Sequence, residues 1–256
     1  MSRRALIDLL KSLHPTRDEK ELFAEILKGN VLVNGERIMK PGTRVAEDAA
    51  IVLPEPARYV SRGGDKLSAA LDAWGVPCAG AVWIDAGCST GGFTDCLLQH
   101  GARFVHAVDV GEGQLDWRLR GDRRVGVREG TNVMSLSPSD LDPAPAAAVA
   151  DLSFRSLRGA ARHILGLTTE GWGIFLVKPQ FEYRDPSADF HGVVKDADTV
   201  RAILRELLVD LAAEGVSAEA AIPSPITGRK GNKEFLFLLR RGGSGVDGLV
   251  DRLILE

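Results

Sequence analysis

The sequence predicts an α/β protein in which a small α+β module at the N-terminus precedes a larger unit built on an open, mainly parallel sheet. Three observations support this prediction. Short apolar runs typical of buried strands alternate with helical patterns through the second part of the chain. One of these runs, within residues 81–100, leads directly into a glycine-rich loop and a helix. The first part instead combines two short helical patterns with an Asn-Gly turn.

Composition places the chain among ordinary globular proteins. Its 256 residues are 45% hydrophobic and 26% charged, enough to bury a sizeable core. The longest apolar runs fall far short of the ~20 residues that span a bilayer, and the N-terminus lacks the apolar core of a signal peptide. Three cysteines without the spacing of a zinc site indicate reduced thiols in the cytoplasm, with neither a disulfide framework nor a metal.

Charge differs mildly between the two parts of the chain. Residues 1–66 hold 12 basic and 10 acidic residues, whereas the remainder holds 20 basic and 25 acidic residues. This polarity fits a small RNA-contacting module ahead of a larger catalytic one, although an excess of two charges also arises by chance in many domains. Composition alone therefore does not decide whether the chain has a nucleic-acid partner.

The N-terminal module is expected over residues 1–54, followed by a linker with proline at residues 55–61. Its predicted elements are helices at 3–13 and 22–27 and strands at 31–33, 37–38 and 51–53. The first helix stops before Pro15, and Gly29 closes the second. Asn34-Gly35 favours a tight hairpin turn because both residues tolerate a positive φ.

These elements, with V-L-V-N-G at 31–35 and K-P-G at 40–42, resemble the RNA-binding module named after ribosomal small-subunit protein four, called the S-four module below. Such modules place basic residues of the second helix and the hairpin against RNA phosphates. The resemblance implies RNA contacts by five basic residues: Arg17, Lys20, Lys28, Arg37 and Lys40. The alternative for each of them is a solvated surface charge.

The larger unit is expected over residues 62–256. V-S-R-G-G-D-K-L at 60–67 precedes a predicted helix at 67–74, and two glycines free the backbone just before it. Arg62 and Lys66 lie near the helix start, where positive charge is mildly unfavourable. This small cost favours a functional role over a surface role for both, and Arg62 joins the candidate RNA contacts.

The strongest local signal is a strand, a glycine loop and a helix in succession. Ala81–Ile84 indicates a buried strand, D-A-G-C-S-T-G-G at 85–92 the loop, and Phe93–His100 the helix. The glycines let a ligand approach the backbone, and the helix N-terminus offers free N–H groups to a carboxylate. Because the spacing differs from that of dinucleotide-binding and phosphate-binding loops, a pyrophosphate ligand is disfavoured.

A second strand, Phe104–Val108, ends in Asp109, some two dozen residues after Asp85. In nucleotide-binding sheets an acid at this place accepts hydrogen bonds from ribose hydroxyls. The two acids and the loop match the S-adenosylmethionine sites of Rossmann-like methyltransferases, although each acid alone could cap a helix or close a turn. The expected cofactor-binding residues are Asp85, Gly87, Ser89, Gly91, Gly92, Phe93, Asp109, Asn132 and Asp151.

The remaining predicted elements complete the sheet. They are strands at 125–128, 147–150, 173–177 and 235–239 and a crossover helix at 197–214. Residues 129–132, after the first of these strands, are placed near the adenine. Asp151 and Lys178 directly follow two of the strands, and the carboxyl ends of parallel strands share the edge where open α/β sheets bind ligands.

Lys66, Asp151, Lys178 and Glu234, called the tetrad below, each border an apolar or glycine-rich stretch where an unpaired charge is costly. Around a cofactor loop they indicate methyl transfer to a ribose hydroxyl. That reaction requires the oxygen in line with the methyl group and its proton removed. We assign the hydroxyl to Lys178, the sulfonium to Asp151, and the orientation of Lys178 to the other two. Whether Lys178 removes the proton or steers the oxygen stays open, and two structural salt bridges are the alternative.

Six motifs make the chain similar to the haemolysin-A-like (TlyA) rRNA methyltransferases, related to the FtsJ-type ribose methyltransferases. They are V-S-R-G-G-D-K-L at 60–67, D-A-G-C-S-T-G-G-F-T-D at 85–95, A-V-D-V-G-E-G-Q-L at 107–115, D-L-S-F at 151–154, L-V-K-P-Q-F-E at 176–182 and G-N-K-E-F-L at 231–236. The resemblance implies a Rossmann-like S-adenosylmethionine-dependent methyltransferase sheet behind a small α+β RNA-binding domain. It also implies 2′-O-methylation of a cytidine in ribosomal RNA, with ribosomal RNA or subunits as partner and the family's Lys-Asp-Lys-Glu set on the tetrad.

Two other functions are compatible with parts of this pattern. One is an RNA-binding ribosome-assembly factor with a vestigial cofactor site. The other is an enzyme that methylates a base, a protein or a small molecule. Base-methylating enzymes typically use a cysteine nucleophile or an N-P-P-Y-type motif; Cys88 lies inside the glycine loop, and the sequence has no N-P-P-Y stretch.

Overall fold

The computed structural model describes residues 2–53, 57–153, 155–184, 190–243, 245 and 248–253, with the side chain of Arg229 left out. The chain divides into two compact units, Met1–Ala57 and Arg58–Glu256, and each is described by itself. Residues 55 and 56 of the expected linker lie outside the described residues, as does Phe154 of the D-L-S-F motif.

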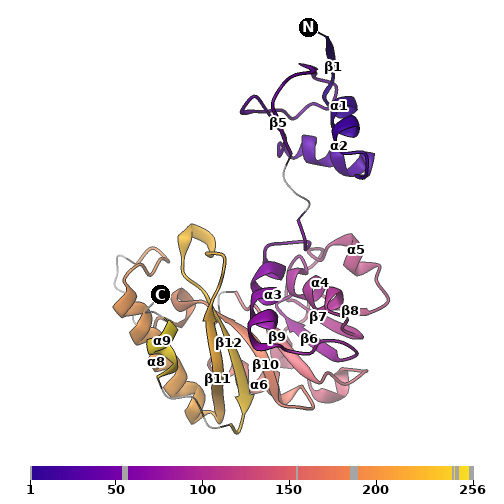
Figure 1. Ribbon diagram of the computed structural model, residues 1–256. Coiled ribbons are helices and arrows are strands. Elements are labelled where there is room, and N and C mark those ends of the chain that lie inside the picture. Colours follow the sequence, from indigo (N-terminus) through magenta and orange to yellow (C-terminus); the bar gives the residue numbers. More distant parts are fainter. Residues whose placement is uncertain are drawn as a thin grey trace. The chain divides into compact units, whose positions relative to one another are not determined.

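The first unit packs two helices and short strands around a small apolar core (Figure 1). Its elements are β1 (Arg3–Ala5), α1 (Leu6–Leu13), α2 (Glu19–Leu27), β2 (Leu32–Val33), β3 (Glu36–Arg37), β4 (Arg44–Ala46) and β5 (Ile51–Val52). β2 pairs with β3 through the Asn34-Gly35 turn, in which both residues have positive φ. The two helices bury Leu6, Leu10 and Ile26 completely, whereas Leu13 and Leu27 at their C-terminal ends are exposed.

Both predicted helices of this unit are wrong at their starts: the second begins at Glu19 rather than Leu22. The strand β4 was not predicted. The first helix begins at Leu6 rather than Arg3, because Arg3–Ala5 forms β1 and pairs antiparallel with β4. Helical spacing cannot exclude this outcome, since a strand partner some forty residues away supplies the backbone hydrogen bonds.

The second unit is built on a seven-stranded mixed sheet in the order β11-β12-β10-β9-β6-β7-β8. Its strands are β6 (Val82–Ala86), β7 (Phe104–Val108), β8 (Val125–Arg128), β9 (Ala147–Ala150), β10 (Trp172–Val177), β11 (Val216–Pro223) and β12 (Phe235–Arg241). β6 to β10 run parallel, and β12 is antiparallel to both β10 and β11. The predicted α/β class with a small N-terminal module is confirmed.

Helices cover both faces of this sheet (Figure 1). They are α3 (Gly63–Trp74), α4 (Gly92–Gln99), α5 (Trp117–Arg120), α6 (Ala160–Gly166), α7 (Pro179–Glu182), α8 (Ala197–Ala213) and α9 (Leu249–Leu253). α3, α4 and α5 contribute to the core on one face, and α6, α8 and α9 to the core on the other. Along β10, Ile174 and Leu176 point into the core on the face covered by α3, α4 and α5, while Phe175 and Val177 point into the core on the opposite face. A strand covered on both faces is apolar throughout, so the sequence showed it clearly.

Three details differ from the predicted elements. β6 extends to Ala86, so Asp85 lies inside a strand rather than in the loop. α3 begins at Gly63, which puts Lys66 in its first turn; a Cβ at Gly64 would collide with the Tyr59 ring, so this helix start requires glycine. β11 was not predicted at all.

No helix in the described part of the chain is long and apolar enough to cross a bilayer.

Candidate active site

The register of the sheet brings the tetrad to one edge. Ala86 at the end of β6 pairs with Ala150 at the end of β9. Val177 at the end of β10 pairs with Phe235 at the start of β12. The residues that come next at this edge are the first loop glycine after β6, Asp151 after β9, Lys178 after β10 and Glu234 before β12.

At this edge the tetrad forms two ion pairs. Lys178 Nζ lies 2.6 Å from Asp151 Oδ1, and Lys66 on α3 pairs with Glu234. The four side chains are between 4% and 27% exposed, with Glu234 the most buried. A carboxylate this deeply buried requires a cationic partner, which Lys66 supplies. The pairing explains why four charges border apolar stretches, but ion pairs alone do not separate a catalytic centre from a structural one.

Lys178 faces oxygen acceptors on the segment that follows β9. Besides the Asp151 carboxylate, Nζ donates to the Leu152 carbonyl at 3.2 Å and to Ser153 Oγ at 3.4 Å. The ammonium also lies 5.6 Å from the centroid of the Phe181 ring. The end of β10 is therefore joined to the end of β9 by a single lysine side chain.

The glycine loop is held against the end of β7. The N–H groups of Gly87 and Cys88 donate to the Val108 carbonyl at 2.8 and 3.1 Å. The Asp109 carboxylate accepts from the Ser89 N–H at 2.8 Å and from the Gly111 N–H at 2.7 Å. Two backbone donors thus fix the orientation of Asp109, the acid that the sequence assigns to a ribose.

The loop leaves no room for side chains at its glycines. Gly87 has φ +85°, and a Cβ there would lie 2.6 Å from the Asp151 carbonyl oxygen. Gly91 has φ +95°, and its Cβ would collide with Leu119. Both positions need glycine for conformation and for space, which fixes the path of the loop, and Ser89 and Thr90 between them are exposed.

Asp85 supplies the test of whether this edge fits the expected cofactor. Its side chain is fully buried, and Oδ2 accepts a hydrogen bond from the Thr94 hydroxyl at 2.6 Å. Oδ1 has no hydrogen-bond partner among the described residues. Burial raises the pKa of this carboxyl to about 7, helped by the nearby charges of Asp151 and Asp109. An orphaned buried carboxylate oxygen needs a donor, and the amino-acid end of S-adenosylmethionine carries an ammonium, so the residues fit this cofactor.

Two other predicted cofactor residues have structural partners. Phe93 on α4 is 3% exposed and packs in the core near Gly63 of α3. The Asn132 side chain, in the segment that follows β8, accepts from the Met134 N–H at 3.0 Å and caps the turn that follows. Gly92 opens α4 and lies close to α3. The predicted polar contacts that the structure gathers around the loop are Asp85, Ser89, Asp109 and Asp151.

The candidate RNA-binding residues divide into two groups. In the first unit, Lys20, Arg37 and Lys40 are exposed. Arg17 instead pairs with Glu21 at 2.6 Å and Lys28 with Glu25 at 3.1 Å, both at helical spacing. Arg62 belongs to the second unit, where it is exposed at the start of α3.

A buried carboxylate near the tetrad was missed by the sequence reasoning. Glu182 at the end of α7 is 2% exposed and accepts from Ser156 Oγ at 2.5 Å, the Leu157 N–H at 2.9 Å and Arg158 Nη1 at 3.0 Å. Burial raises the pKa of this carboxyl. We call this group the Glu182 clamp; it ties the segment after β9 to the segment after β10. The signal was present in K-P-Q-F-E, where a glutamate closes an apolar stretch just as the tetrad residues do.

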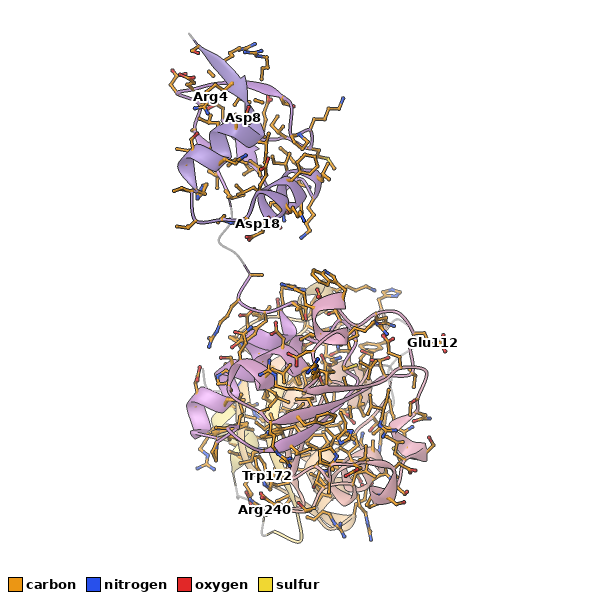
Figure 2. The ribbon with its side chains drawn as sticks, turned by 90° about the vertical axis from the view of Figure 1, so that its right-hand side faces the viewer. Arg4, Asp8, Asp18, Glu112, Trp172 and Arg240 are labelled. Atoms are coloured by element: carbon orange, nitrogen blue, oxygen red, sulfur yellow. The ribbon has the colours of Figure 1, made fainter. Side chains whose placement is uncertain are left out.

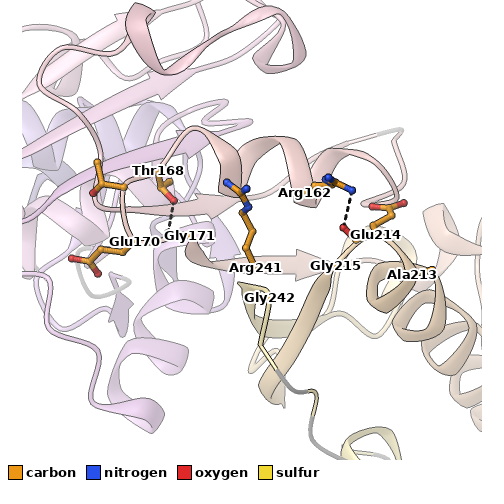
Figure 3. A pocket seen from close by; sticks show the side chains of 10 residues that line it. Arg162, Thr168, Glu170, Gly171, Ala213, Glu214, Gly215, Arg241 and Gly242 are labelled. Atoms are coloured by element: carbon orange, nitrogen blue, oxygen red, sulfur yellow. Dashed lines mark hydrogen bonds between the residues drawn. The ribbon is translucent and has the colours of Figure 1, made fainter.

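A cavity of about 610 Å³ lies at the opposite end of the sheet (Figure 3). The described residues that line it, such as Arg162, Gly171 and Arg241, include none of the predicted site residues. Near this end Trp172 and Arg240 are register partners (Figure 2). Within the described residues no group of three or more histidine, cysteine, aspartate or glutamate side chains is placed to hold a metal ion.

The sheet, the glycine loop and the acids around it define an α/β methyltransferase of the Rossmann-like class that uses S-adenosylmethionine. More specifically, the chain belongs to the FtsJ-like methyltransferase family, which matches residues 59–241. The resemblance inferred from the six motifs is thereby confirmed.

Relatives match nearly the whole chain. YqxC from Bacillus subtilis (strain 168) is 40% identical over 96% of this chain and 89% of its own length. The protein named 16S/23S rRNA (cytidine-2'-O)-methyltransferase TlyA from Mycobacterium tuberculosis (strain H37Rv, ATCC 25618) is 37% identical over 100% of this chain and 99% of its own. A solved structure from Streptococcus thermophilus that carries the name hemolysin has 33% identity and a TM-score of 0.75, covering 100% of this chain and 95% of that one.

Proposed function

We propose that this protein transfers a methyl group from S-adenosylmethionine to the ribose 2′-hydroxyl of a cytidine in ribosomal RNA. The observation that carries the proposal is the gathering of two lysine–carboxylate pairs at the same sheet edge as the glycine loop and the orphaned Asp85 carboxylate. The choice of cytidine and ribosomal RNA is supported by the TlyA relative, which matches this chain over its whole length.

The residues around the loop are suited to hold the cofactor, which supplies an electrophilic methyl group on a sulfonium when bound. We assign its ammonium to Asp85 Oδ1, which has no other partner among the described residues. We assign its ribose to Asp109, whose carboxylate is already oriented by the Ser89 and Gly111 N–H groups. Gly87 and Gly91 let the loop turn tightly against its neighbours, and Ser89 and Thr90 between them are exposed.

Lys178 is the residue we assign to the 2′-oxygen. Its ammonium forms an ion pair with Asp151 and donates to the Leu152 carbonyl and to Ser153 Oγ, so the side chain is held in place before any substrate arrives. A fixed cationic donor beside the 2′-oxygen orients it and stabilises the negative charge that develops as its proton leaves. The Lys66–Glu234 pair occupies the adjoining position at the start of β12 and fixes the charge next to Lys178.

The experiment is methylation of purified ribosomal subunits with labelled cofactor by the Lys178→Ala variant. We expect methyl transfer to be abolished while cofactor affinity stays at the wild-type value. Arg201→Ala, which breaks an exposed ion pair with Asp198, is the control and should keep full activity. Alkaline hydrolysis of the labelled RNA should leave a resistant dinucleotide, because a methylated 2′-oxygen cannot attack the neighbouring phosphate. Full activity of Lys178→Ala contradicts the assignment, and label in mononucleotides contradicts ribose methylation.

We further propose that residues 1–54 form an S-four-type RNA-binding domain, joined through 55–61 to the methyltransferase domain at 62–256 and acting in the cytoplasm. The exposed cations Lys20, Arg37 and Lys40 support this role, and the free, buried cysteines fit a reducing compartment. Replacing the three cations by alanine in the full chain should weaken RNA binding and reduce its salt dependence, with cofactor affinity unchanged. An unaltered salt dependence contradicts the proposal.

A further inference from the structure

Two large apolar side chains are exposed beside the cofactor loop. Trp117, the first residue of α5, is 78% exposed, and Val110, which directly follows Asp109, is 71% exposed. Among the described residues of the second unit, one other large apolar side chain is this exposed: Val209 on α8, at 69%. Tryptophan side chains are enriched where proteins bind other molecules, so an exposed ring beside the cofactor loop is a candidate contact for a ligand.

Trp117 is held in a fixed place relative to the loop. The Asp116 N–H donates to the Thr90 carbonyl at 3.2 Å, directly ahead of the tryptophan. Leu119, two residues later, packs so closely on Gly91 that a Cβ at that glycine would collide with it. Upstream of the tryptophan, Gln114 Oε1 accepts from the loop hydroxyl Ser89 Oγ at 3.1 Å. The segment that carries Trp117 is therefore pinned to the loop on both sides of the exposed ring.

The segment around this tryptophan is basic within a unit that is otherwise acidic. D-W-R-L-R-G-D-R-R at 116–124 holds four arginines and two aspartates, whereas residues 67–256 hold 20 basic and 25 acidic residues. Three of the arginines form ion pairs: Arg118 with Asp116 at 3.0 Å, Arg120 with Glu129 at 2.5 Å and Arg124 with Asp122 at 2.7 Å. Their side chains are still between 43% and 60% exposed, so the segment presents guanidinium groups to a ligand on the residues that follow Trp117. An aromatic face combined with arginines is the composition that binds single-stranded nucleic acid.

We propose that Trp117 forms a stacking platform for a base of the substrate RNA close to the methylated nucleotide, with the arginines of residues 118–124 contacting the adjoining phosphates. The proposal rests on the proposed function, because it takes RNA as the substrate. It explains why an apolar ring is exposed next to the cofactor loop. Stacking of one base on an aromatic side chain is sequence-tolerant, so the platform adds affinity rather than base identity.

The test compares Trp117→Ala, Trp117→Phe and the control Val209→Ala as full-length proteins with a protein-free ribosomal RNA fragment. Trp117→Ala should raise the Kd for RNA by about 10-fold or more, within the range for one lost base stack. Trp117→Phe should restore most of the affinity because it keeps an aromatic face. Val209→Ala, equally exposed but on α8, should bind as the wild type does. Cofactor affinity should be the same in all four proteins.

Direct RNA binding keeps this test independent of methyl transfer. The same comparison in the Lys178→Ala background should give the same ratios, so an inactive enzyme does not hide the platform. Unchanged RNA affinity in Trp117→Ala overturns the proposal. So does a loss of cofactor affinity, which would make Trp117 part of the cofactor site, or a defect that appears with whole subunits but not with protein-free RNA, which would indicate a protein partner. If Trp117→Ala does not fold, quenching of tryptophan fluorescence on adding RNA, present in wild type and absent in Trp117→Phe, decides the question.

Discussion

The Glu182 clamp gives the most specific prediction about stability. Glu182→Ala removes a carboxylate that is 2% exposed and accepts hydrogen bonds from Ser156, Leu157 and Arg158. Breaking a buried ion pair by removing one partner costs about 3–5 kcal/mol. Arg158 keeps a second partner, Asp210 at 2.7 Å, so we expect the lower end, about 3 kcal/mol. In a unit of this size each kcal/mol lowers the Tm by about 2–4 °C, which gives a fall of roughly 6–12 °C.

Glu182→Gln separates the charge of the clamp from its shape. An amide oxygen still accepts from the Leu157 N–H, but the charge-assisted bond to Arg158 is lost, so we expect about half the destabilisation of the alanine variant. The clamp joins the segments that carry Asp151 and Lys178. Both variants should therefore have lower turnover than the wild type even at assay temperatures well below their Tm, with cofactor affinity unchanged.

Thermal and urea unfolding of the full chain, followed by circular dichroism, measure these changes. The control is Asp198→Ala, which removes a carboxylate that is 86% exposed and pairs with Arg201 at the surface. It should change the free energy of unfolding by no more than about 0.5 kcal/mol. If Glu182→Ala melts within about 2 °C of the wild type, the clamp does not contribute about 3 kcal/mol to the free energy of unfolding.

Three further predictions concern the same sheet edge. Gly228→Ala places a Cβ against Glu234 Oε1 and should displace that carboxylate, lowering turnover about 100-fold in the methylation assay without unfolding the protein. Gly91→Ala should weaken cofactor binding in calorimetry, whereas Gly80→Ala, at a similarly positive φ but in open space, should not. Burial raises the pKa of Asp85 from 3.8 to about 7, so the folded state binds more protons than the unfolded one between these two values, and its stability should fall as pH rises through that range. Asp85→Asn should flatten the Tm profile between pH 5 and 8, and a profile as steep as the wild type's would contradict this.

The sheet was largely predictable because its central strands are apolar on both faces. β10 alternates between two cores, so every position is apolar and the run stands out. β11 did not stand out because its residues are mainly alanine, serine and glutamate, and it is a partly exposed edge strand with a bulge near Ala218. Its main support is pairing with β12, a long-range backbone interaction that leaves no local pattern in the sequence.

The members of the site were predictable, but their pairing was not. Charges that border apolar strands are visible in the sequence, which is how Lys178 and Glu234 were found. That Lys66 pairs with Glu234, 168 residues away, depends on where α3 starts and on β12 lying beside β10. Trp117 was missed for a related reason: its exposure is a property of the fold, and an isolated tryptophan in a sequence is more often buried.

The position of the two ion pairs argues for chemistry more strongly than the stability they give. A buried ion pair repays its desolvation only with good geometry, and apolar side chains of similar volume often stabilise as well or better. Glu234 is 4% exposed and Lys66 12%, so this pair bears that cost almost in full. The Asp85 carboxylate bears a further cost, with one oxygen unpaired among the described residues. Stability alone gives no reason to gather two partly buried ion pairs and a buried carboxylate at one sheet edge. A cationic cofactor and an oxygen that must lose a proton, in contrast, require charges at that place.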